Sequence, residues 1–151
     1  MKKLLLTLGL VGSLSLAAAG HAEPLPTVTV YKSPTCGCCT DWVRHLEDNG
    51  FAVDAINTQN LNTIKTEAGL SPALASCHTA FVDDYVIEGH VPAEDIHRLL
   101  AEGLPARGLS VPGMPAGSPG MEMGDRHDPY QVLLFNEQGQ TRVFANYPDP
   151  H

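Results

Sequence analysis

The sequence has few basic residues, few cysteines and methionines, and only one long apolar run. Its 151 residues include 9 Lys and Arg against 17 Asp and Glu, which gives a formal net charge of −8 with histidine neutral. A surface this acidic repels nucleic acid and anionic lipid, so neither is expected as a partner. The sequence also has no Ser/His/Asp arrangement, no glycine loop suited to phosphate and no paired-carboxylate site. These absences remove the commonest hydrolase and nucleotide-binding classes.

The one apolar run lies at the start of the chain. Lys2 and Lys3 precede apolar residues 4–19, and small residues at Gly20 and Ala22 follow. This pattern predicts a secretory signal peptide over residues 1–22, with cleavage after Ala22. An uncleaved membrane anchor is the alternative, but the run is shorter than the ~20 residues that a spanning helix needs. We therefore expect an exported, periplasmic domain over residues 23–151 with no membrane contact after cleavage.

Three of the four cysteines lie within the hexapeptide TCGCCT, as Cys36, Cys38 and Cys39, and the fourth is Cys77. Exported cysteines usually pair, so two structural disulfides are one interpretation. The spacing argues against it, because neither Cys38–Cys39 nor Cys36–Cys38 closes easily without strain. A Cys36–Cys39 disulfide, or one between any of the three and Cys77, remains possible.

Hydrophobic patterning predicts one α/β domain. Strands are expected where β-branched and aromatic residues alternate, and helices where apolar residues recur on one side. The expected strands span 27–31, 51–56, 77–82 and 85–88, and the expected helices span 38–49, 61–68 and 93–102. The resulting order, β-α-β-α-β-β-α, with thiols between the first strand and the first helix, resembles the thioredoxin and glutaredoxin-like fold.

That topology predicts where the reactive side chains meet. The end of the first strand, the start of the third and the end of the fourth share one edge of the sheet. These places carry the TCGCCT cysteines, Cys77 with His78, and His90. The chain departs from thioredoxins in two ways: the second residue between Cys36 and Cys39 is Cys38, and Cys77 rather than proline precedes the third strand.

Residues 103–129 show no helical or strand period and are expected to form a long loop. They contain Met114, Met121 and Met123, which are all the methionines apart from the initiator. Thioethers are soft ligands that suit Cu(I), and an ordered loop of this length usually has a use. The alternative is a surface loop whose methionines pack on the sheet. Beyond it, residues 130–147 predict a β-hairpin that extends or covers a sheet edge.

Several separated motifs are similar to one family of small exported thioredoxin-like metal-binding proteins associated with copper resistance, the CopG-like proteins. The motifs are YKSPTCGCC (31–39), SCHT (76–79), VIEGHVP (86–92), PGMP (112–115) and GSPGME (117–122). The resemblance covers nearly the whole predicted mature chain. It implies copper handling in the periplasm more firmly than it implies a reaction, and it suggests other periplasmic copper-resistance proteins as partners.

Two functional hypotheses follow. In the first, crowded thiolates bridge several Cu(I) ions, because bridging suits closely spaced sulfur better than a single tetrahedral zinc does. The candidate ligands are Cys36, Cys38, Cys39, Cys77, Met114, Met121, His78 and His90. Silver would suit the same atoms.

The second hypothesis is a thiol–disulfide oxidoreductase, in which Cys36 attacks a substrate disulfide and Cys39 resolves the mixed disulfide. Cys38 would compete as a resolving thiol, which weighs against it. The two hypotheses merge in a copper oxidoreductase that interconverts Cu(I) and Cu(II), so enzymatic activity is left open. A purely structural adaptor is disfavoured, because it would not need the thiol cluster.

Overall fold

A computed structural model describes residues 24–148, so the predicted signal peptide lies outside the described residues. Within residues 24–148, no helix is long and apolar enough to cross a membrane. The elements in chain order are β1 (Val28–Lys32), α1 (Gly37–Asp48), β2 (Val53–Asn57), α2 (Leu61–Glu67), the 3₁₀ turn η1 (Pro72–Leu74), β3 (His78–Val82), β4 (Tyr85–Glu88), α3 (Ala93–Glu102), β5 (Gly108–Ser110), β6 (Tyr130–Phe135) and β7 (Thr141–Tyr147).

One seven-stranded sheet organises the domain, in the order β2-β1-β3-β4-β5-β6-β7. β1 pairs in parallel with β2 and antiparallel with β3, and β4 pairs antiparallel with β3, so β4 runs in the direction of β1. This is the predicted β-α-β-α-β-β-α order, and it confirms the thioredoxin-like α/β fold. The end of β1, the start of β3 and the end of β4 consequently share one edge.

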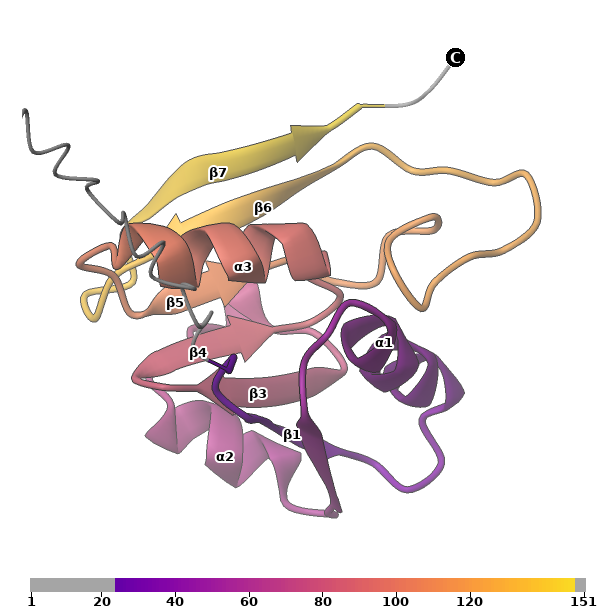
Figure 1. The fold of residues 1–151 in the computed structure, drawn as a ribbon, viewed down its shortest axis with the longest axis horizontal. Coiled ribbons are helices and arrows are strands. Elements are labelled where there is room, and N and C mark those ends of the chain that lie inside the picture. The colour runs from indigo at the N-terminus through magenta and orange to yellow at the C-terminus, as the bar shows by residue number, and fades with distance from the viewer. Residues whose placement is uncertain (1–23, 149–151) are drawn as a thin grey trace, which may run out of the picture.

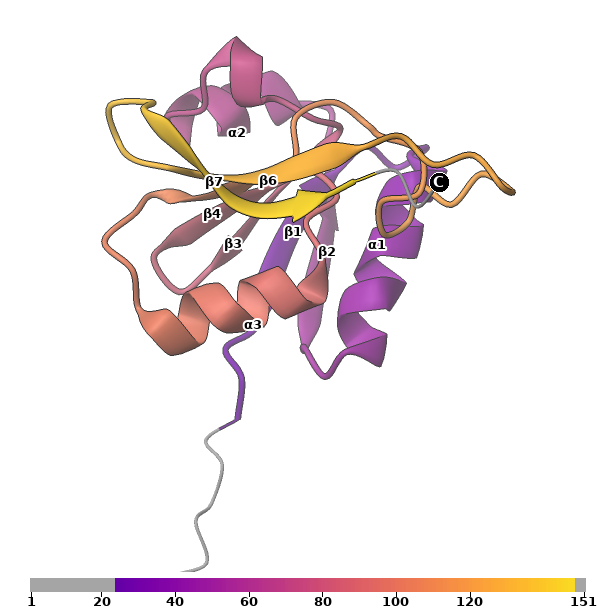
Figure 2. The ribbon, with the colours of Figure 1, turned by 90° about the horizontal axis from the view of Figure 1, so that it is seen from above.

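Helices cover both faces of the sheet, as Figure 2 shows, with α2 on one side and α1 and α3 on the other. The α1 and α3 side holds the larger core, where Trp42, Leu46 and Ile96 are fully buried against strand residues such as Val30. The α2 side holds a smaller cluster around Leu74, Val86 and Phe135. The sheet is thus a packed layer that fixes the strand ends rigidly.

The expectation that residues 103–129 contain no regular element is wrong at one place. Residues Gly108–Ser110 form the short strand β5, which is fully buried and pairs in parallel with β4. Close backbone approach explains the glycine, because a Cβ at Gly108 would lie 1.8 Å from the carbonyl oxygen of Val86. A strand of three residues shows no measurable period, so the sequence pattern gave no signal for it.

The C-terminal hairpin is present as predicted, and β5 connects it to the rest of the sheet. β6 pairs with β5, and β7 pairs with β6 across an irregularity between Val132 and Leu133. The hairpin therefore extends the sheet, as the two long strands of Figure 1 show. The remaining loop, residues 111–129, leaves β5 and runs past the start of α1 before it returns to β6 (Figures 1 and 2).

Candidate metal centre

The TCGCCT cysteines lie at the amino-terminal end of α1. Cys36 is the N-cap residue, and Cys38 and Cys39 lie in the first turn. Cys36 and Cys39 form a disulfide, and the Cys38 sulfur lies 3.5 Å from the Cys36 sulfur. Cys39 is fully buried, whereas Cys36 and Cys38 are half-buried. If the disulfide were reduced, the Cys36 sulfur would lie at a helix end whose free N–H groups and dipole stabilise negative charge.

Cys77 faces this cluster from the residue immediately before β3. Its sulfur lies 3.5 Å from the Cys39 sulfur, 3.3 Å from Nδ1 of His78 and 3.1 Å from Nε2 of His90. Pairing between β3 and β4 brings the two histidines together, because the backbone N–H of Gly89 donates to the carbonyl of His78. The predicted convergence at this sheet edge is therefore what the fold produces.

Two groups of possible metal ligands result, and Cys77 belongs to both. One contains the four sulfurs of Cys36, Cys38, Cys39 and Cys77; the other contains Cys77, His78 and His90. Within each group the ligand atoms all lie within 4.8 Å of one another. Such donor sets suit soft and borderline metal ions.

Burial favours the uncharged forms of Cys77, His78 and His90. Burial, followed by the neighbouring Cys38, raises the pKa of the Cys77 thiol. Burial lowers the pKa of His90 and, more strongly, that of His78, which also faces His90 and Lys65. Below the cluster, the Trp42 ring lies 4.3 Å from the His78 ring. Neutral imidazoles offer lone pairs to a metal, and a bound cation would displace the thiol proton.

The loop 111–129 lies against the cluster and its neighbouring residues in two places, at residues 119–120 and at Gly113. The carbonyl of Pro119 accepts a 2.8 Å hydrogen bond from Nδ1 of His90. Gly120 lies against α1 so closely that a Cβ there would be 2.7 Å from the carbonyl oxygen of Cys38 and from the backbone nitrogen of Trp42. Met121 follows directly and is half-buried.

The second contact holds the start of the same loop. The backbone N–H of Gly113 donates to the carbonyl of Ala75 at 3.1 Å, and the Ser76 hydroxyl donates to the Gly113 carbonyl. Met114 follows this contact and is 53% exposed. Both candidate methionines thus lie one residue beyond an anchored position near the cluster. Whether their sulfurs bind metal stays a prediction.

A buried ion pair beside Cys77 was missed by the sequence analysis. Glu88 is fully buried, and its carboxylate pairs with Lys65. It also accepts hydrogen bonds from the backbone N–H of Ser76 at 2.6 Å and from the Thr79 hydroxyl at 2.7 Å. Burial raises the pKa of Glu88, and the Lys65 ammonium opposes that shift. No signal marked this residue, because a glutamate at the end of a strand normally faces solvent.

Two other histidines have contacts of their own away from the cluster. His45 accepts a hydrogen bond through Nε2 from the backbone N–H of Ala93 at 3.0 Å. His97 lies within hydrogen-bonding distance of the Asn49 carbonyl, at 3.0 Å, and its ring lies 4.4 Å from that of Phe51. Both rings link α1 to neighbouring elements, which accounts for them structurally.

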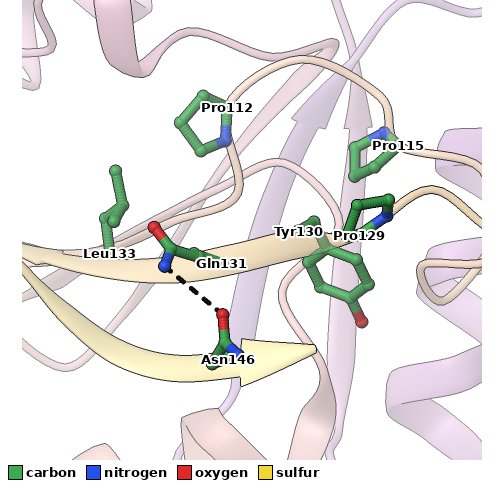
Figure 3. Close-up of a pocket in the computed structure, with 7 residues that line it drawn as sticks. All are labelled: Pro112, Pro115, Pro129, Tyr130, Gln131, Leu133 and Asn146. Atoms are coloured by element: carbon green, nitrogen blue, oxygen red, sulfur yellow. Dashed lines mark hydrogen bonds between the residues drawn. The ribbon is translucent and has the colours of Figure 1, made fainter. Parts of the chain in front are cut away.

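A groove of about 500 Å³ lies between the loop and the hairpin, as Figure 3 shows. It is lined by Pro112, Pro115, Pro129, Tyr130, Gln131, Leu133 and Asn146. A hydrogen bond of 3.3 Å from Gln131 to Asn146 crosses the two strands at its floor. The lining includes no cysteine, histidine or carboxylate, so the groove offers none of the donor types found in the sulfur cluster.

Fold and site together define a class of protein. It is a thioredoxin-like domain in which further thiols and imidazoles lie beside the two cysteines of the C-x-x-C motif. A family model described as "Protein of unknown function, DUF411" matches residues 74–121, which include Cys77, both cluster histidines, Met114 and Met121. No curated protein matches the chain.

Two solved structures are similar over most of the length. A structure described as "Copper resistance protein copG- Form 2" is 47% identical, covers 83% of this chain and 100% of its own, and has a TM-score of 0.79. The structure described as "Copper resistance protein copG- Form 1" is 48% identical, with 83% and 99% coverage and a TM-score of 0.79. The chain belongs to the CopG family of copper resistance proteins, which confirms the resemblance found in the sequence.

Proposed function

We propose that this protein binds copper as its cargo and serves copper resistance. One observation carries the proposal: the sulfurs of all four cysteines lie within 4.8 Å of one another on the rigid edge of the sheet. Copper-resistance relatives at 47% and 48% identity support copper rather than another soft ion. The acidic chain also favours a cationic cargo.

The finer proposal is a cysteine-bridged Cu(I) site that holds more than one ion. Thiolates are soft ligands, and a thiolate can bridge two ions, so four crowded sulfurs suit a polynuclear cluster. Reduction of the Cys36–Cys39 disulfide must come first, because a disulfide sulfur is not a thiolate. In this proposal His78 and His90 contribute imidazoles, and Met114 and Met121 close over the cluster from the anchored loop.

We also propose that the site interconverts Cu(I) and Cu(II). Reduction of the Cys36–Cys39 disulfide takes two electrons and yields two thiolates. Oxidation of two Cu(I) ions to Cu(II) supplies two electrons, so the exchange balances without a further reactant. The proximity of Cys39 to Cys77, at 3.5 Å, keeps the disulfide beside the metal ligands.

A thiol–disulfide oxidoreductase is the second candidate, and the Cys36–Cys39 disulfide at the start of α1 favours it. Reduced Cys36 would attack a substrate disulfide, and Cys39 would then resolve the mixed disulfide. Cys38 weighs against it, because its sulfur lies 3.5 Å from that of Cys36 and competes for the same bond.

An anaerobic Cu(I) titration of the fully reduced protein tests the first candidate. Two or more ions retained per chain, with all four thiols becoming unreactive together, is the expected result. The double variant Cys36→Ser/Cys39→Ser should lose tight binding, whereas His45→Gln should keep it, because His45 contacts Ala93 instead. Full copper stoichiometry in the double variant would contradict the cluster.

A disulfide-exchange assay on the same samples separates the second candidate. Rapid reduction of a protein disulfide by the metal-free protein, together with no retained copper, would make the protein an oxidoreductase. The periplasmic location is part of the same proposal and rests on residues 1–22. Cell fractionation, with and without those residues, tests it.

A further inference from the structure

In its disulfide form the protein has lost two of its four thiols but keeps a complete second ligand group. Cys36 and Cys39 are joined to each other, so neither can bind a metal ion as a thiolate. Cys77, by contrast, has a free thiol and lies beside two imidazoles. The disulfide therefore leaves two free thiols, Cys38 and Cys77, and of these Cys77 is the one grouped with two imidazole nitrogens.

The three donors already face one another. The Cys77 sulfur lies 3.3 Å from Nδ1 of His78 and 3.1 Å from Nε2 of His90, and all three ligand atoms lie within 4.8 Å. Cys77 and His78 enter from the start of β3, and His90 enters from the turn after β4. Since β3 and β4 are paired in the sheet, this convergence does not depend on the helix that carries the disulfide.

His90 is oriented as a metal ligand should be. Its Nδ1–H donates to the carbonyl of Pro119, which leaves the lone pair of Nε2 directed at Cys77. Metal-binding histidines typically donate their other ring N–H to a carbonyl or carboxylate, and this contact fixes the tautomer. Both His90 and its neighbour His78 have no solvent-exposed surface.

One ring nitrogen of His78 lacks a hydrogen-bond partner in the described part of the chain, and the other faces the Cys77 sulfur. Nε2 of His78 is a buried side-chain nitrogen without a hydrogen-bond partner among the residues that the structure describes. Its Nδ1 contacts only the Cys77 sulfur. A buried polar group normally has a partner, because leaving it unpaired costs about 1–3 kcal/mol. Packing against Trp42 would be served as well by an apolar side chain. A metal ion bound at Nδ1 would leave Nε2 unpaired, so the observation that supports the site is the position of Nδ1 beside the Cys77 sulfur.

We propose that Cys77, His78 and His90 form a second, mononuclear site for a divalent cation, and that this site persists when Cys36 and Cys39 are joined. Two imidazoles and one thiolate are a donor set that Cu(II) takes, and one that also suits Zn(II) and Co(II). That the physiological occupant is Cu(II) rests on the copper function proposed above. The redox state of the Cys36–Cys39 pair then selects the ion: four thiolates bind Cu(I), and the remaining group binds Cu(II).

The test uses Co(II), which does not oxidise thiols as Cu(II) can. The full-length protein, with its disulfide verified by mass spectrometry, is titrated with Co(II) without oxygen. One ion per chain should bind and give the visible absorption and charge-transfer bands of a thiolate-bound, four-coordinate ion. Cys77→Ser and His90→Gln should each weaken binding by about 100-fold or more, since even second-shell changes cost 10–100-fold.

Matched controls separate this site from chance binding to other side chains. His45→Gln and His127→Gln should leave the Co(II) affinity unchanged, because neither belongs to a group of candidate metal ligands. Unchanged affinity in His90→Gln, or a spectrum without thiolate charge transfer, would overturn the proposal.

The role of His78 is tested in the unaltered protein, because a substitution of this fully buried side chain could prevent folding. Histidine-ring ¹H–¹⁵N spectra with Zn(II) should show two rings bound, His78 through Nδ1 and His90 through Nε2. Binding by His90 alone would overturn the two-histidine site. The Cu(I) titration of the reduced protein is independent of all these outcomes, so failure here does not disprove the copper cluster, and the reverse also holds.

Discussion

The buried Glu88–Lys65 pair gives the sharpest energetic prediction. Glu88 is fully buried, the Lys65 side chain is only 13% exposed, and the carboxylate also accepts from Ser76 and Thr79. Glu88→Ala would leave the Lys65 ammonium without its carboxylate and the Ser76 N–H without an acceptor. Removing one partner of a buried pair costs about 3–5 kcal/mol, which is a large share of a typical stability of about 5–15 kcal/mol.

Replacing both partners should cost less than removing one. In Glu88→Leu/Lys65→Met no charge is stranded, and the remaining loss is the unpaired donors at Ser76 and Thr79. Both variants leave these two donors unpaired, at about 1–3 kcal/mol each, and Glu88→Ala also strands the Lys65 ammonium, so we expect the double variant to be more stable than Glu88→Ala. The difference between the two isolates the stranded charge from the lost hydrogen bonds.

Urea unfolding followed by tryptophan fluorescence measures both, because Trp42 is the one tryptophan and lies in the core next to the site. The protein is metal-free with its disulfide intact in every sample. Glu67→Ala on exposed α2 surface is the control and should change stability by no more than about 0.5 kcal/mol. A loss below about 1 kcal/mol in Glu88→Ala, or a double variant that is less stable still, would refute the reasoning.

Three further predictions concern the site and its loop. The pKa of His78 is lowered from 6.5 in the folded state, so the unfolded state binds more protons below that value. The metal-free protein should therefore lose stability as pH falls from about 7.5 to about 5.5, and His78→Gln should lose less, as seen in thermal unfolding; equal losses would contradict this. Met114→Leu with Met121→Leu should speed copper loss to a chelator while thiol reactivity stays unchanged, and equal retention would return the loop to a surface role. Gly120→Ala should displace the loop from α1, because its Cβ would lie 2.7 Å from the Trp42 nitrogen, and should change near-ultraviolet circular dichroism; an unchanged spectrum would show that the contact yields easily.

Most of the fold could be predicted because its signals are local. Alternating β-branched residues mark β1, and Asn49 with Gly50 marks the end of α1, whose apolar residues Trp42 and Leu46 recur at helical spacing. The exception, β5, is held by its neighbours on both sides rather than by its own pattern. Its Gly108 is needed for close contact with Val86, and that requirement appears only once the strands are paired.

The candidate site likewise has one part that could be predicted from the sequence and another that depends on long-range contacts. Topology alone places Cys77, His78 and His90 on the edge that faces α1, so their convergence follows from element order. The hydrogen bond from His90 to Pro119 spans 29 residues and has no local signature. The burial of Glu88 also has no local signature, because it depends on pairing with Lys65 of α2.

Cys77 is the residue on which the two metal groups depend, because it is the one donor that they share. If both proposed sites exist, filling one would alter the other. Cu(I) bridged through Cys77 would draw the lone pairs of its sulfur away from the histidine group, and a divalent ion there would remove that sulfur from the thiolate cluster. The two forms of the site therefore compete. Its neighbours hold Cys77 in place for both, since Glu88 fixes the Ser76 backbone on one side and Pro119 orients His90 on the other.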